Sequence, residues 1–317
     1  MIRFVLQRAA QAVVVVVLVT VVTFLLLHAL PGGPARGILG LKATQLQIAQ
    51  FDKVNGFDEP LPQQYWSYLV RLLHGNLGTS YKLNETVASL LVQRIPKTLL
   101  LTGMSTAIAL VVAVPLGVWQ ALHRHRVGDH LTSSLALLGY ATPSFFLALV
   151  LVIVFAEKWP LLPPEAPQST SLGSLLAHFS GLVLPIVTGA VTTLAAFSRY
   201  ARSSVLDNLG EDYVRTARAK GASERRVVWL HVLRNSLTSL VALLGYYLPV
   251  LFGGAVVVES IYNYPGVGLL FWNAAQESDY PVLLGVVLVI SVATVVGSLA
   301  ADLAQAAIDP RVRGALR

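Results

Sequence analysis

The chain has 317 residues, of which 55% are hydrophobic and only 12% are charged. A soluble domain carries about a quarter charged residues, so this composition excludes an ordinary soluble protein. The net charge of +7 is compatible with a nucleic-acid partner or an anionic surface. The absence of cysteine excludes disulfides, thiolate metal sites and cysteine nucleophiles.

Six apolar stretches are long enough to cross a membrane. A spanning helix needs about 20 apolar residues, because each adds about 1.5 Å and every backbone group must bond within the helix. The first stretch follows Arg3 and Arg8, as in a signal peptide, but it is too long for one and no small-residue cleavage site follows, which favours a retained helix. The predicted spans are residues 9–30, 99–122, 131–156, 180–198, 236–258 and 282–301.

Lysine and arginine set the predicted orientation. With a cytoplasmic N-terminus, 15 of the 23 basic residues fall in the inner segments 1–8, 123–130, 199–235 and 302–317. Their density there is roughly threefold higher than in the outer segments, as the positive-inside rule requires. Both termini are therefore predicted to be cytoplasmic. The same distribution explains the positive charge through membrane topology, and no nucleic-acid partner is predicted.

The connections between the spans define the predicted domains. They are an N-terminal tail with the first span (1–30), an extracytoplasmic domain (31–98) and a core domain with the other five spans (99–317). Within the core, residues 199–235 form a basic cytoplasmic loop. Residues 259–281 form an extracytoplasmic loop whose aromatic side chains flank a Pro-Gly turn, which favours an interfacial or re-entrant segment.

Sequence patterns of catalytic chemistry are absent. A phosphate-binding P-loop requires lysine directly after its second glycine, but Ile38 follows Gly37 in the nearest approach to that pattern. The chain is therefore not predicted to hydrolyse ATP, and no catalytic residue is assigned. His123, His125 and His130 cluster in one short loop, where a basic topological signal explains them better than a metal site. No metal ligand is predicted.

The predicted spans also bear on the source of energy. Ion-coupled carriers keep charged side chains inside the helix bundle, whereas these spans are nearly free of them. Glu259 and Asp302 lie at predicted helix ends, where a carboxylate reaches water, although either could line a pathway. No ring of carbonyls or charges typical of a channel filter is visible. Energy supplied by other chains is favoured, while a carrier working without an ATPase and a scaffold or sensor that moves no solute stay open.

Two short helices are predicted outside the spans, one near residues 61–73 and one over 211–220. The second begins with acidic residues and ends with basic ones, which suits the helix dipole, and Gly221 supplies a C-terminal stop. Arg215 and Arg218 share one face of it. The segment is either a solvated basic helix or a docking helix whose arginines pair with a partner's carboxylates.

The same segment resembles the EAA loop of ABC importer permeases, E-A-A-x-x-x-G. It departs from the general motif at Arg215 and Thr216, but residues 212–221 match every position of D-Y-[VI]-R-T-A-R-A-K-G, the version of the peptide/nickel branch. Residues 231–235 match the following H-x-L-[RK]-[NP]. Further stretches, in order and at family spacing, resemble the B-type subunit of a dipeptide/oligopeptide permease: residues 57–65, 75–80, 94–99, 258–268 and 309–311.

The resemblance implies an all-α integral membrane protein with the type I ABC importer permease fold, six transmembrane helices and an extracytoplasmic domain between helices 1 and 2. It implies a bacterial cytoplasmic membrane with its lipid, and a heterodimer with a second, C-type permease subunit. Two ATPase subunits, or one fused ATPase chain, would use ATP and Mg, with no cofactor on this chain. An extracytoplasmic substrate-binding protein would deliver the solute, a dipeptide, an oligopeptide, glutathione or a nickel chelate.

The resemblance also implies site residues. Coupling to the ATPases would fall to Asp212, Tyr213, Arg215, Thr216, Ala217, Arg218, Ala219, Lys220, Gly221 and Ala222. Contacts with the binding protein, or a gate, would fall to Glu259, Tyr262, Tyr264, Pro265 and Gly266. A bulky residue at Gly221, or reversal of both arginine charges, is expected to uncouple transport while membrane insertion is kept.

Overall fold

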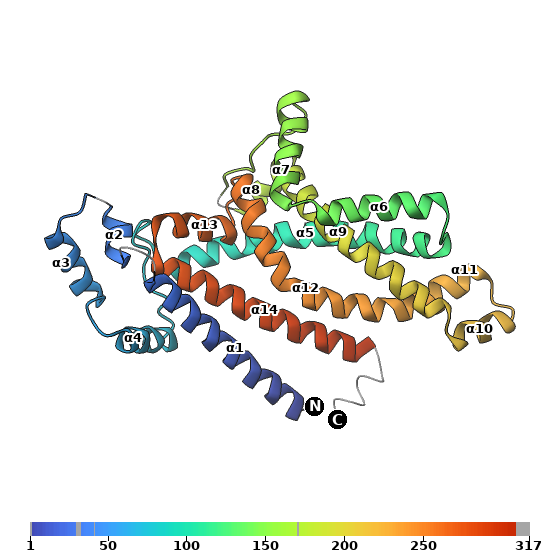
Figure 1. Cartoon of the computed structure of the whole chain (residues 1–317), viewed down its shortest axis with the longest axis horizontal. Coiled ribbons are helices and arrows are strands. Elements are labelled where there is room, and N and C mark those ends of the chain that lie inside the picture. The colour runs from blue at the N-terminus through green and yellow to red at the C-terminus, as the bar shows by residue number, and fades with distance from the viewer. Residues whose placement is uncertain (1, 30–32, 41, 170, 309–317) are drawn as a thin grey trace. The chain divides into compact units, whose positions relative to one another are not determined.

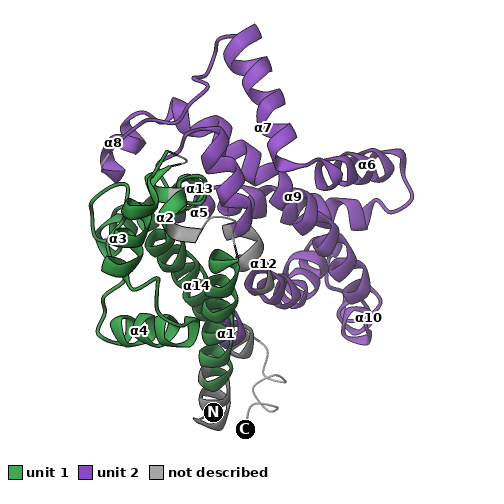
Figure 2. Cartoon of the chain, turned by 60° about the vertical axis from the view of Figure 1, so that its left-hand side comes forward, with its two compact units in different colours: residues 1–98, 265–296 green, residues 99–264, 297–317 purple. Residues whose placement is uncertain are grey.

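The computed structural model describes residues 2–29, 33–40, 42–169 and 171–308 (Figure 1). Within these residues the regular structure is helical, and the extended pairing consists of a single bridge between Thr79 and Thr86. The chain separates into two compact units, which Figure 2 colours separately. Unit 1 comprises residues 1–98 and 265–296, and unit 2 comprises residues 99–264 and 297–317.

Five helical segments among the described residues are long and apolar enough to cross a membrane. They lie in α1 (Ile2–His28), α5 (Val87–Leu122), α9 (Ser180–Leu209), the stretch Glu224–Gly245 that leads into α12 (Leu233–Ile261), and α14 (Tyr280–Ile308). Each overlaps a span predicted from the sequence. The all-helical membrane architecture is therefore confirmed.

The remaining predicted span, residues 131–156, is not one straight helix. Val127–Ala141 and Ser144–Lys158 meet at an angle of 101°, and the pair counts as a sixth crossing only if it is taken as one broken span. The break falls where Thr142 takes an extended conformation before Pro143. A proline disfavours helical geometry in the preceding residue and lacks the N–H that would continue the ladder. The sequence predicted one continuous span over residues 131–156, and the bend corrects that prediction.

Unit 1 holds the short helices that follow α1. They are α2 (Gly33–Leu39), α3 (Gln45–Asn55) and α4 (Leu61–Leu73), so the predicted helix at 61–73 is confirmed. Thr44 caps α3 through its side chain, and Gln47 returns the bond in a capping box. The unit also contains α13 (Val267–Glu277), which occupies about half of the predicted loop 259–281.

A buried carboxylate joins distant parts of unit 1. Asp279 is 2% exposed and accepts hydrogen bonds from the Ser80 hydroxyl and from the backbone N–H groups of Tyr81 and Lys82. Nearby, the Tyr280 hydroxyl donates to the Leu27 carbonyl at 2.8 Å. A buried carboxylate requires hydrogen-bond donors, and Asp279 finds them in the segment before α5. Together with the Tyr280 bond, these contacts tie the start of α14 to that segment and to α1.

Unit 2 is organised around α9, which packs against α6 (Val127–Ala141), α7 (Ser144–Val152) and α12. Small residues allow these helices to approach closely, as is common in membrane proteins. In α5, an added Cβ at Gly117 would lie 2.5 Å from the Ala201 Cβ and 2.8 Å from the Ser198 carbonyl oxygen in α9. Only glycine fits at this contact.

Gly117→Ala is therefore expected to destabilise the protein by about 1–3 kcal/mol, because the added methyl group meets backbone atoms that cannot move aside. Thermal unfolding of the detergent-purified protein measures the loss. Gly103→Ala in the same helix is the matched control, since nothing lies within 4 Å of its added Cβ and alanine favours a helix over glycine by about 1 kcal/mol. Equal melting temperatures for the two variants would contradict the close contact.

Candidate functional site

The predicted docking segment is a discrete helix, α10 (Asp212–Ala219). Glu211 precedes it in an extended conformation, and Lys220 and Gly221 end it. Gly221 has φ +79°, a conformation that residues with a side chain rarely adopt, so glycine is the natural stop at this position. The helix predicted over 211–220 is confirmed in type, and each of its ends agrees to within one residue.

The inner face of α10 is anchored in an apolar cluster. Val214 is fully buried, and Tyr213, Ala217 and Ala222 pack around it. The Tyr213 hydroxyl donates to the Asn208 side-chain oxygen at 2.6 Å. Burying a valine side chain contributes about 1.5–3 kcal/mol, so α10 is held firmly against unit 2.

The anchor, here called the coupling cluster, reaches several helices. Its other buried members come from α5, from the end of α9 and from the π-helical segment η2 (Val227–Val232): Val118, Ala121, Val205, Val227, Val228 and Val232. Interiors this closely packed transmit displacement rather than absorbing it. A force applied to α10 therefore acts directly on three other elements of unit 2.

The outer face of α10 is polar and exposed. Asp212, Arg215, Thr216, Ala219 and Lys220 all lie on it. The Arg215 side chain is 76% exposed and meets Asp212 at 3.5 Å, an exposed i,i+3 pair that contributes little. Its guanidinium is therefore open to a carboxylate on another molecule.

Arg218 differs from Arg215, because this chain already supplies its partner. Its guanidinium donates to both carboxylate oxygens of Glu224, at 2.7 and 3.1 Å. The Glu224 carboxylate raises the pKa of Arg218 above its ordinary value. The pair spans the turn between α10 and α11 (Glu224–Arg226). Arg218 thus fixes the shape of this turn, a role that sequence reading did not assign.

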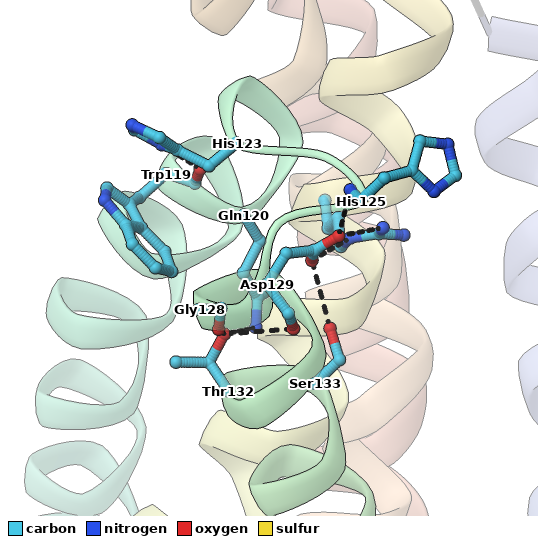
Figure 3. A network of polar contacts seen from close by, with 9 residues as sticks. Trp119, Gln120, His123, His125, Gly128, Asp129, Thr132 and Ser133 are labelled. Atoms are coloured by element: carbon cyan, nitrogen blue, oxygen red, sulfur yellow. Dashed lines mark hydrogen bonds and ion pairs between the residues drawn. The ribbon is translucent and has the colours of Figure 1, made fainter.

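A second polar centre lies at the start of α6 (Figure 3). Asp129 is 2% exposed and accepts two bonds from Arg202 of α9, at 2.9 and 2.8 Å. The backbone N–H of His125 and the Ser133 hydroxyl also donate to it, at 3.1 and 3.2 Å. Every lone pair of this buried carboxylate that geometry allows is thus engaged.

Sequence reading counted Arg202 only as a topological charge and did not single out Asp129. The available signal was a lone carboxylate, directly before an apolar stretch, in a loop otherwise rich in arginine and histidine. A buried carboxylate of that kind needs a cation. Which of the many basic residues supplies it depends on the packing of α6 against α9, and a single sequence does not reveal that packing.

The residues predicted to contact a binding protein or form a gate are buried. Glu259, Tyr262 and Tyr264 have no exposed surface, and Pro265 and Gly266 are buried as well. Their predicted role in contacts with a binding protein or in gating stays a prediction.

Tyr262 joins three elements of unit 2. Its hydroxyl lies 2.9 Å from the Thr188 hydroxyl in α9 and 3.3 Å from the Ala148 carbonyl in α7. Its carbonyl accepts from the N–H of Ala166 at 2.8 Å. The turn after α12 is thus closed by its own hydrogen bonds, with Asn263 at φ +49°.

Unit 2 also contains a cavity of about 220 Å³ between α5, α7, α9 and α12. Among the residues that the structure describes, no charged side chain lines it, and several lining residues carry hydroxyl groups: Thr102, Ser105, Ser144, Thr192, Thr193 and Tyr247. Hydroxyls both donate and accept hydrogen bonds. The cavity wall is neutral yet able to bind polar groups.

Several helices long and apolar enough to cross a membrane define the class of an integral membrane protein. The fold resembles that of solved structures of the MetNI methionine ABC transporter in inward-facing conformations. One of its chains matches with a TM-score of 0.53 and 19% identity over 69% of this chain and 96% of that chain, and another with a TM-score of 0.51 and 17% identity over 70% and 97%.

Family models identify the chain more closely. The model of the binding-protein-dependent transport system inner membrane component matches residues 113–314, and the model of its N-terminal part matches residues 1–102. The chain belongs to this family and is a permease of the peptide/nickel branch of ABC importers. It is a membrane subunit of a bacterial inner membrane, and the family is not itself catalytic.

Relatives of known name extend over the full chain. A provisionally named peptide permease protein of Brucella ovis is 39% identical over 99% of both chains. The oligopeptide transport system permease protein AppB of Bacillus subtilis is 34% identical over 98% of this chain and 99% of its own. The glutathione transport system permease protein GsiC of Salmonella paratyphi A is 36% identical over 99% of both.

Proposed function

We propose that this chain forms half of the translocation pathway of an ATP-driven peptide importer and that α10 docks into an ATPase subunit. Relatives named for peptides, oligopeptides and glutathione, itself a tripeptide, support a short peptide as the solute. A second permease subunit, ATPases on separate chains that bind ATP and Mg, and a substrate-binding protein complete the machine. Residues 31–98 lie outside the membrane in this proposal, and both termini lie in the cytoplasm.

One observation carries the docking role. α10 is two-faced: Val214 fixes one face in the coupling cluster, while the other presents Asp212, Arg215 and Lys220 to solvent. A solvated basic helix with no partner needs no such anchor to the ends of α5, α9 and η2. A docking helix does, because movement of the partner must reach the membrane helices.

The mechanism follows from this anchor. Closure of the ATPases on ATP displaces α10, and the coupling cluster passes the displacement to α5 and α9 as rigid elements. The differential binding of the ATPases to two arrangements of the bundle shifts the population between inward-open and outward-open states. ATP hydrolysis thereby drives transport although this chain carries no nucleotide site.

The neutral cavity of unit 2 is proposed as part of the pathway wall. A passage that accepts peptides of varied sequence has to bind what all peptides share, the main-chain amides. Hydroxyls such as Ser105 and Thr193 bind amides without favouring either charge on a side chain. Peptides with acidic and with basic side chains are then expected to pass at similar rates.

Uptake by a deletion strain carrying the chain on a plasmid tests the proposal. A panel of labelled dipeptides, tripeptides, glutathione and a nickel chelate separates the candidate solutes. ATP-dependent uptake of short peptides, with an ATPase chain recovered alongside the tagged permease, is the expected result. Transport by this chain reconstituted alone would indicate a carrier without an ATPase, and unchanged uptake on deletion would indicate a scaffold or sensor.

A further inference from the structure

Unit 1 contains a cavity of about 730 Å³. Its volume falls within the range of about 300–1,000 Å³ typical of small-molecule sites. It is bounded by α1, α3, α4, the segment 76–84 and the start of α14. Aromatic rings from all five of these elements, and one from the turn between α3 and α4, form much of its wall: Phe24, Phe51, Phe57, Tyr68, Tyr81 and Tyr280.

Several polar groups at the cavity are satisfied within the fold. His28 lies 2.9 Å from the Gln64 side-chain oxygen, and the Gln64 amide donates to the carbonyls of Phe57 and Glu59 at 3.1 and 2.7 Å. These bonds hold α1, α4 and the turn before α4 together. They fix the shape of the cavity wall.

The cations of the cavity are not neutralised. Lys53 and Arg71 both line it, and among the described residues neither has a carboxylate within ion-pair distance. Glu59 supplies one carboxylate at the same wall. The lining therefore has an excess of positive charge, which favours a ligand that carries an anion.

A buried hydroxyl points to the same conclusion. Tyr68 is only 8% exposed, and its hydroxyl has no hydrogen-bond partner in the part of the chain that the structure describes. An unsatisfied buried hydroxyl costs about 1–3 kcal/mol, so a native protein rarely keeps one without a reason. By contrast, the hydroxyl of neighbouring Tyr65 lies 3.0 Å from the Thr20 hydroxyl.

Arg71 lies close to this hydroxyl. It follows Tyr68 by three residues in α4 and therefore shares a face with it. Burial raises the pKa of Tyr68 to about 12 and that of Tyr81 to about 12, and the Arg71 guanidinium opposes the rise at both. Arg71 thus acts on two tyrosines of the cavity wall. One acceptor bound here can meet a guanidinium and a phenol together.

We propose that the unit 1 cavity is a binding site for a short peptide, whose C-terminal carboxylate is bound by Arg71 and the Tyr68 hydroxyl. Apolar side chains of the peptide pack on the aromatic wall, and Glu59 faces its ammonium group. The amide side chains of Asn55, Asn76 and Asn84 suit main-chain groups. A lipid would need an uninterrupted apolar wall for its acyl chains, which these polar residues exclude. This inference rests on the proposed function for the identity of the solute.

Equilibrium dialysis tests the proposal on the detergent-purified assembly of permease and ATPase subunits without its binding protein. The probes are labelled Ala-Ala-Phe and the same tripeptide with a C-terminal amide. Loss of a charge-assisted hydrogen bond weakens binding by roughly tenfold or more, which we expect for the amide and for Arg71→Gln. Arg36→Gln, an exposed arginine of α2 that does not line the cavity, is the matched control and should bind normally.

Tyr68→Phe separates a ligand role from a structural one. Removing an unpaired buried hydroxyl should leave the melting temperature unchanged or raise it, while peptide affinity falls by about threefold to tenfold because one hydrogen bond is lost. A purely structural tyrosine would show the opposite pattern, with lower stability and unchanged binding.

Equal affinity of the unaltered assembly for the acid and the amide would overturn the proposal. So would equal affinity of the Arg71→Gln and Arg36→Gln variants for the tripeptide acid. So would binding of short-chain phosphatidylglycerol in place of the tripeptide, which would assign the cavity to a lipid headgroup. Uptake by the unaltered assembly with its binding protein is measured in parallel. Uptake of Ala-Ala-Phe without dialysis binding refutes this site alone, whereas absence of any peptide uptake refutes the proposed function.

Discussion

Reversing the charge at one exposed position, Arg215→Glu, is expected to lower peptide uptake by about tenfold or more, because a like-charge contact at a docked interface costs several kcal/mol. The ATPase activity that uptake stimulates should fall in parallel. Within this chain the change loses only an exposed pair with Asp212 at 3.5 Å. Folding and membrane insertion should therefore be unaffected, as the melting temperature and the amount of protein in the membrane would report.

Two controls separate docking from local structure. Arg36→Glu reverses another exposed arginine, in unit 1, and should leave uptake unchanged. Arg218→Glu breaks the pair with Glu224, and the swapped pair Arg218→Glu with Glu224→Arg restores it. If uptake by Arg215→Glu is normal, the outer face of α10 does not bind the ATPase. Recovery of uptake in the double variant would show that Arg218 acts by shaping the turn and not by contacting the ATPase.

The largest loss of stability is expected from Asp129→Ala. The change removes the carboxylate that accepts bonds from Arg202, from the backbone of His125 and from Ser133. Breaking a fully buried pair costs about 3–5 kcal/mol. Since the Arg202 side chain keeps 29% of its surface exposed, water compensates in part and we expect about 2–3 kcal/mol. Thermal unfolding of the purified protein measures this loss.

Conservative variants show which part of the interaction matters. Arg202→Lys keeps the charge but loses the planar fork that meets both carboxylate oxygens. This variant should therefore keep only part of the stability that the Arg202–Asp129 pair contributes. Asp129→Asn keeps an acceptor without the charge, and its melting temperature should lie between those of the alanine variant and the natural protein. A melting temperature of Asp129→Ala equal to that of the natural protein would contradict a stabilising role for the pair.

The membrane architecture and helix α10 could be predicted from the sequence because their signals are local. An uninterrupted apolar stretch defines a span whatever surrounds it. The acidic start, basic end and terminal Gly221 of α10 likewise act within the helix itself. The family motif at residues 212–221 predicts a docking role for this helix, and that role stays a prediction.

What the sequence could not supply depends on contacts between distant segments. The partner of Asp129 lies 73 residues along the chain, and that of Asp279 nearly 200 residues away. The two faces of α10 could not be told apart until Val214 was seen within the coupling cluster. The unit 1 cavity combines α1, α4 and the start of α14, elements separated by most of the chain. The bend at Pro143 was missed because many membrane helices accommodate proline.

Cross-linking from the exposed face of α10 is the decisive experiment on whether this helix docks on an ATPase. The chain has no cysteine, so Ala219→Cys, on that exposed face, introduces a single reactive site. Lys42→Cys, an exposed position in the segment proposed to lie outside the membrane, is the control. A short maleimide cross-linker should join Cys at position 219 to an ATPase chain, with a yield that changes on ATP binding, and should leave position 42 unlinked. An assembly that copurifies intact with its ATPase, yet yields no such product from position 219, would contradict the docking of α10 on the ATPase.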